Sequence, residues 1–132
     1  MFQTRADHHA VLDLAADQPM LEQTLRWAAI NSGTGNLAGL AKVADELAGG
    51  FARLHGDIRL LAADPVESIL PDGQTRTAER GRNLHLTVRP MAPVQLLLTG
   101  HMDTVFAADH PFQSIVTLDD GRINNGQLTC GN

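Results

Sequence analysis

A run of bulky apolar residues, Val94 to Leu98, leads almost directly into Gly100, His101 and Asp103. The run shows little alternation of apolar and polar residues, which predicts a strand that is covered on both faces. In α/β sheets of this kind, ligand sites form beyond the carboxyl ends of the strands. We therefore expect an α/β fold, a mixed sheet with helices on both faces, and a functional site at His101 and Asp103.

Two amphipathic helices are expected before this strand. The first has Asp17 as a candidate N-cap and Pro19 near its first turn, and its apolar residues recur at helical spacing as far as Ala28. The second begins at Asn36 and places apolar residues along one stripe, which suits packing against a sheet. These residues are Leu40, Ala44, Leu47, Phe51 and Leu54. Either helix could also serve only the core.

The other segments predict strands and turns. Residues 57–65 are strand-like, residues 70–83 form a polar connection that contains glycine, and residues 84–90 alternate as a half-buried strand does. The three residues between this last strand and the apolar run are too few for a crossover, so the two strands should pair antiparallel. Residues 112–123 predict a hairpin that turns at Asp119 to Gly121.

Composition limits the classes of function. A chain of 132 residues with 43% hydrophobic residues can build one core, and a net charge of −5 without a basic cluster argues against nucleic acid as a partner. The start lacks the layout of a signal peptide, and no apolar run approaches the roughly 18 residues of a membrane span. With Cys130 as the single cysteine there is no disulfide framework and no thiolate cluster. We expect a cytoplasmic protein without membrane contact, and an exposed Cys130.

The spacing of His101 and Asp103 matters because residues two apart in an extended segment point to the same side. A carboxylate beside an imidazole can accept its second N–H, fix its tautomer and raise its basicity as a metal ligand. The alternative is a histidine–aspartate hydrogen bond that only caps a strand.

A longer string supports the metal interpretation. The residues "LLLTGHMDTVF" (96–106), with "INSGTGN" (30–36) upstream and "HPF" and "LDDGRI" downstream, resemble the N-terminal portion of the M20 family of zinc metallopeptidases. The similarity is greatest to its glutamate-carboxypeptidase-like members, and it runs from the first helix to about Ile123.

The resemblance implies a function and roles for two residues. His101 would bind one metal of a pair of zinc ions, and Asp103 would orient that histidine. The complete enzyme would cleave the amide bond of a small peptide or N-acyl amino acid by metal-activated water. Members of the family are often homodimers through a lid domain.

The chain departs from the family after the "DDGR" turn. It continues "INNGQLTCGN", without the bridging aspartate, the Glu-Glu pair, the further acidic ligand, the second histidine and the lid domain. We therefore expect residues 1–132 to be the N-terminal portion of an M20 catalytic domain, and residues 124–132 to be an aberrant end from a truncation or a shifted reading frame. The alternative function is a truncated, non-catalytic remnant. In either case we expect zinc not to be retained by this chain alone.

The remaining histidines have mostly structural interpretations. His110 follows the motif closely and is a candidate to line a substrate entrance. His8 and His9 are expected to be solvated in a loose N-terminus, and His85 to face solvent from an alternating strand. His55 is expected to close a helix, where a cation suits the helix dipole.

Overall fold

The computed structural model describes residues 5–111, 113–119 and 122–124. The helices are α1 (Arg5–Ala16), α2 (Met20–Ala28), α3 (Leu37–Phe51) and the 3₁₀ turn η1 (Ala52–Leu54). The strands are β1 (Asp57–Leu61), β2 (Val66–Ile69), β3 (Thr75–Ala78), β4 (Asn83–Thr87), β5 (Val116–Thr117) and β6 (Ile123–Asn124). The chain is thus a mixed α/β protein, as expected.

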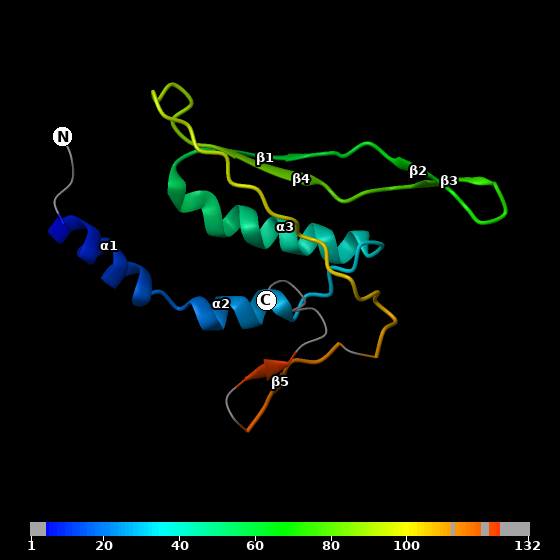
Figure 1. The fold of residues 1–132 in the computed structure, drawn as a ribbon, viewed down its shortest axis with the longest axis horizontal. Coiled ribbons are helices and arrows are strands. Elements are labelled where there is room, and N and C mark those ends of the chain that lie inside the picture. The colour runs from blue at the N-terminus through cyan, green and yellow to red at the C-terminus, as the bar shows by residue number, and fades with distance from the viewer. Residues whose placement is uncertain (1–4, 112, 120–121, 125–132) are drawn as a thin grey trace.

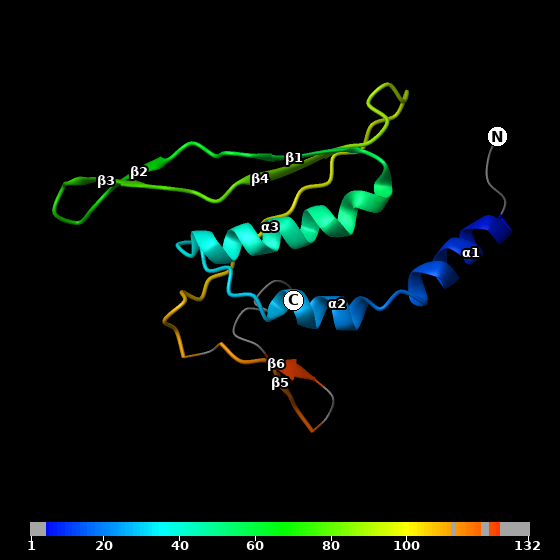
Figure 2. The ribbon, with the colours of Figure 1, turned by 180° about the vertical axis from the view of Figure 1, so that it is seen from behind.

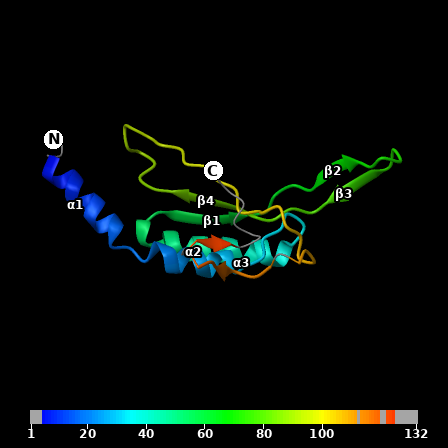
Figure 3. The ribbon, with the colours of Figure 1, turned by 60° about the horizontal axis from the view of Figure 1, so that its bottom comes forward.

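The strands of the described residues form three two-stranded antiparallel sheets instead of one mixed sheet. The ribbon of β1 and β4 lies along α3, and α2 lies on the opposite side of that helix (Figure 1). The view from behind shows the same order, with the hairpin of β5 and β6 beyond α2 (Figure 2). The β2–β3 hairpin extends away from the helices, at the opposite end from α1 (Figure 3).

Helix α3 begins where the sequence predicts. Asn36 is its N-cap, and the side-chain oxygen of Asn36 accepts a hydrogen bond from the Gly39 N–H at 3.0 Å. The first half of the predicted stripe, Leu40 and Ala44, is buried. The second half is not, because Phe51 and Leu54 are 40% and 50% exposed.

The predicted cap of α2 is wrong. Asp17 still belongs to the end of α1, because its N–H donates to the Asp13 carbonyl at 3.1 Å. Pro19 is the N-cap of α2 and makes no side-chain capping bond. The start that the sequence predicts to be loose forms α1 from Arg5 onwards, and residues 8–16 of this helix are exposed. His8 and His9 are nevertheless exposed, as expected.

The alternating strand is confirmed as β4. It pairs with β1 in the register Arg59↔His85, and the neighbouring pairs Ile58↔Leu86 and Leu60↔Leu84 are half-buried while His85 is exposed. The expected polar connection at 70–83 is wrong in part, because residues 66–78 form the β2–β3 hairpin. Its turn is set by Gly73, whose φ of 82° suits glycine.

The strongest sequence expectation, a buried strand at Val94 to Leu98, is wrong. No strand is assigned there, and the side chains of Val94, Leu96, Leu97 and Leu98 are between 75% and 91% exposed. A central strand needs backbone partners on both sides, and among the described residues β4 pairs only with β1. The Gln95 amide donates to the carbonyls of Arg89, Pro90 and Ala92 and stabilises the turn after β4. The described segment that returns from this turn forms no ladder with β4.

The strands of the predicted hairpin near the end are confirmed, because Val116 pairs with Asn124 and Thr117 with Ile123 in an antiparallel register. Residues 120–121 of its turn, Cys130 and the rest of the aberrant end after Asn124 lie outside the described residues. Within the described part of the chain, no helix is long and apolar enough to cross a membrane.

Candidate functional site

Two segments far apart in the sequence are joined at the candidate site. Gly33 and Thr104 form a parallel β-bridge, in which the Thr104 N–H donates to the Ser32 carbonyl at 2.9 Å and the Thr34 N–H donates to the Thr104 carbonyl at 3.2 Å. Ser32 is only 4% exposed. A Cβ atom at Gly33 would collide with the Phe106 carbonyl oxygen, so glycine permits this close approach.

The side chain of Asn31 ties this junction to the start of α3. Its amide nitrogen donates to the Gln113 side-chain oxygen at 2.7 Å. Its carbonyl oxygen accepts from the Gly33 N–H at 3.1 Å and from the Asn36 amide at 3.0 Å. The loop that carries His101 is therefore held against the N-cap of α3 by polar contacts.

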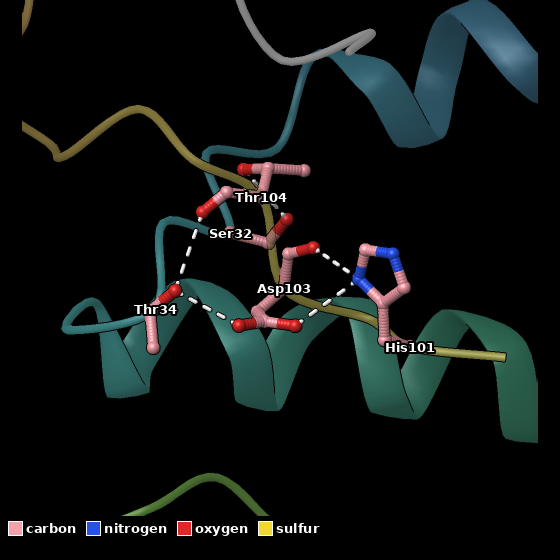
Figure 4. A network of polar contacts seen from close by, with 5 residues as sticks. All are labelled: Ser32, Thr34, His101, Asp103 and Thr104. Carbon is pink, nitrogen blue, oxygen red and sulfur yellow. Dashed lines mark hydrogen bonds and ion pairs between the residues drawn. The ribbon is translucent and has the colours of Figure 1, made fainter. Parts of the chain in front are cut away.

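His101 and Asp103 contact each other, as the sequence predicts. The Nδ1 atom of His101 lies 2.8 Å from the Asp103 carbonyl oxygen and 3.1 Å from the Asp103 carboxylate Oδ1 (Figure 4). Both oxygens can only accept a hydrogen bond, so Nδ1 carries the proton. In the neutral ring the lone pair is then on Nε2, which is the form of the imidazole that binds metals.

Thr34 is a site residue that the sequence reasoning did not single out. Its hydroxyl donates to the Asp103 carboxylate Oδ2 at 2.8 Å, so the two carboxylate oxygens are shared between Thr34 and His101 (Figure 4). The Thr34 hydrogen bond is the main reason that the pKa of Asp103 is lowered; the hydrogen bond and charge of His101 lower it further, while partial burial opposes the shift. No periodicity or spacing in "SGTGN" marks Thr34, because its partner lies 69 residues away.

The site lies at the surface. The side chains of His101 and Asp103 are 66% and 39% exposed. Among the residues that the structure describes, no group of three or more His, Cys, Asp or Glu side chains is placed to hold a metal ion. The donor chemistry therefore fits one ligand of a zinc site, an imidazole with its tautomer fixed, and does not supply a complete ligand set.

His110 lies in the loop that follows the site. Its ring packs against Phe106 with 4.4 Å between the ring centroids and a tilt of 41°. The His110 N–H donates to the Ala107 carbonyl at 3.1 Å, which makes the loop compact. The structure thus gives His110 a packing contact near the site, and its role in substrate binding stays a prediction.

The fold and the site define a mixed α/β protein with a surface histidine whose tautomer is set by an aspartate. Comparison with known proteins found no matching family model, no matching curated protein and no matching solved structure.

Proposed function

We propose that the chain is the N-terminal part of the catalytic domain of a zinc-dependent hydrolase of the M20 type. The complete enzyme would cleave an amide bond in a small peptide or N-acyl amino acid. In this proposal His101 is a zinc ligand and Asp103 orients it. A cytoplasmic location belongs to the same proposal, since a single cysteine allows no intrachain disulfide.

The observation that carries the proposal is the contact between His101 and Asp103. Two acceptor oxygens of Asp103 lie within 3.1 Å of Nδ1, which keeps the proton on that atom and the lone pair on Nε2. A histidine that only caps a strand needs no such selection of tautomer. Zinc, when bound, would supply a water of lowered pKa and a positive charge for the carbonyl oxygen. The residues of this chain would hold and orient the imidazole.

A second candidate is a non-catalytic remnant. It is favoured by one observation, that the described residues bring no third His, Cys, Asp or Glu side chain to His101 and Asp103. One imidazole contributes a small part of the binding energy of a complete zinc site. This candidate predicts that the fold and the His101–Asp103 contact are present without hydrolysis.

Zinc titration of the chain tests the ligand role of His101. The ¹⁵N NMR shifts of the imidazole nitrogens report which atom is protonated and which atom meets the metal. We expect the Nδ1–H form before zinc is added and a selective shift of Nε2 with zinc, with weak affinity and no stoichiometric zinc after dialysis. A shift at the exposed His9 equal to that at His101 would contradict a specific role.

A fusion distinguishes the two candidate functions. The chain is joined in frame to the remaining part of an M20 catalytic domain, and hydrolysis of an N-acyl amino acid is measured with zinc. We expect turnover that His101→Ala abolishes, and a loss of about 10–100-fold in zinc affinity for Asp103→Ala. His9→Ala, a substitution on the exposed face of α1, is the matched control. A well-folded fusion without turnover would support the non-catalytic remnant.

A further inference from the structure

A pocket of about 510 Å³ lies at the end of the β1–β4 ribbon where β1 begins and β4 ends. Side chains with polar or charged ends line most of it. The ionisable residues of this lining are His55, Asp57, Arg59, His85 and Arg89. None of them takes part in the contacts around His101.

The sheet register explains why these residues share one face. Arg59 lies opposite His85, and Asp57 opposite Thr87, so these positions alternate with the half-buried residues that face α3. The outer face of the ribbon is therefore mostly polar, with Leu61 as an apolar residue at its other end. His55 and Arg89 flank it, one just before β1 and the other just after β4.

The charges in the pocket are unbalanced. Asp57 is the only acidic residue among the described residues that line it, and the Asp57 Oδ2 is 2.6 Å from Arg59 Nε in an ion pair. Within the described part of the chain, the side chains of Arg89, His55 and His85 form no hydrogen bond or ion pair. A surplus of donors is thus gathered at one place on a chain whose net charge is −5.

Backbone conformation is a second observation at the same place. His55 with φ 51° and Arg89 with φ 47° are the non-glycine residues of positive φ among the described residues, and both line this pocket. Residues with a side chain rarely adopt this backbone conformation. At His55 it forms the left-handed C-cap of η1, and at Arg89 it belongs to the turn after β4. The Gln95 amide, bonded to the Arg89, Pro90 and Ala92 carbonyls, fixes the turn that positions Arg89.

We propose that this pocket binds a small oxyanion, the phosphate of a phosphate ester or the carboxylates of a dicarboxylic acid. The planar fork of Arg89 can give two parallel hydrogen bonds to either group. The imidazoles of His55 and His85 and the outer nitrogens of Arg59 provide further donors around the same volume. The proposal is independent of the zinc hydrolase function, because the two sites share no residue.

NMR titration of the ¹⁵N-labelled chain at constant ionic strength tests the proposal. Glycerol phosphate and succinate are the two probes, and sodium chloride is the control. We expect saturable shifts at the pocket residues with at least one probe, and the stronger probe identifies the preferred oxyanion. Shifts that match those of chloride, or that do not saturate, would overturn the proposal.

Charge variants separate this pocket from general electrostatics. Arg89→Gln should weaken binding by about tenfold, because it removes a charge-assisted pair of hydrogen bonds. Arg76→Gln, on the distant β2–β3 hairpin, removes the same charge and should change the affinity less than twofold. If Arg89→Gln alters the turn that contains residue 89, His85→Gln serves as the second variant of a pocket residue. Equal affinities for the pocket variants and for Arg76→Gln would refute the site.

Discussion

The carboxylate of Asp103 is divided between two partners. One oxygen accepts the Thr34 hydroxyl and the other lies against His101, so the orientation of the imidazole depends on a residue that never touches it. Both partners stabilise the ionised form of the carboxylate, and the pKa of Asp103 is lowered in consequence.

The stabilisation by Asp103 should depend on pH. Its pKa is lower in the folded chain than in the unfolded one, so the contribution is present above the ordinary value of about 3.9 and disappears as the pH falls through the folded value. Chemical denaturation of the wild type and of Asp103→Asn, at pH 6 and at pH 3, measures it. The free energy of unfolding should be larger for the wild type than for Asp103→Asn at pH 6, and this difference should be smaller at pH 3. A difference in unfolding free energy that grows toward pH 3 would contradict the direction of the pKa shift of Asp103.

Thr34→Val should raise the pKa of Asp103 toward its ordinary value, because it removes the hydroxyl and keeps the shape. ¹³C NMR of the carboxyl group measures the titration. Thr34→Ser retains the donor and should leave the pKa near that of the wild type. If valine and serine behave alike, the hydroxyl is not the cause of the shift.

At the scale of elements, α3 contains three glycines, and two of them, Gly39 and Gly49, have opposite surroundings. A Cβ at Gly39 would collide with the Asn31 carbonyl oxygen, which belongs to the junction with the His101 loop, whereas nothing lies within 4 Å of a Cβ at Gly49. The first glycine allows the helix to approach the loop, and the second only lowers helix propensity.

The two alanine substitutions should therefore have opposite effects. Gly49→Ala should stabilise the chain by about 0.5–1 kcal/mol through helix propensity. Gly39→Ala should destabilise it by about 1–3 kcal/mol, because the helix start must move. Urea denaturation followed by circular dichroism compares the two with the wild type. If both alanine variants are more stable than the wild type, the start of α3 can move without an energetic penalty.

Local signals in the sequence were sufficient for some elements. Asn36 predicts the start of α3 because capping involves residues three apart, and the alternation in β4 reflects contact with one neighbouring helix. The contact of His101 with Asp103 is equally local. The partner strands of Val94 to Leu98 and the role of Thr34 depend on residues distant in the sequence, and periodicity carries no information about these.

At the scale of the whole molecule, the apolar segment Val94 to Leu98 is the most exposed hydrophobic stretch among the described residues. Its leucines expose more than 85% of their surface, and within the described residues its backbone is not paired in a sheet. Unpaired extended segments of this composition associate with one another. We expect oligomers or poor solubility at high concentration.

Leu97→Lys should reduce this association, because a charge in an extended apolar segment disfavours pairing. Light scattering over a concentration series measures it. Met91→Lys adds the same charge at an equally exposed position outside the segment and should have a smaller effect. A wild-type chain that stays monomeric at all concentrations would refute the expectation.

The bridge between Gly33 and Thr104 also determines when the His101 site can form during folding. Thr34 and Thr104 are 70 residues apart, and closing a flexible loop of that length costs about 4 kcal/mol in chain entropy. We expect the intervening β1–β4 ribbon to form first, because it shortens the effective loop that the bridge must close. We therefore expect the orientation of His101 to be acquired late in folding and to be among the first features lost by partial unfolding, which hydrogen exchange of the Thr34 and Thr104 amides would measure.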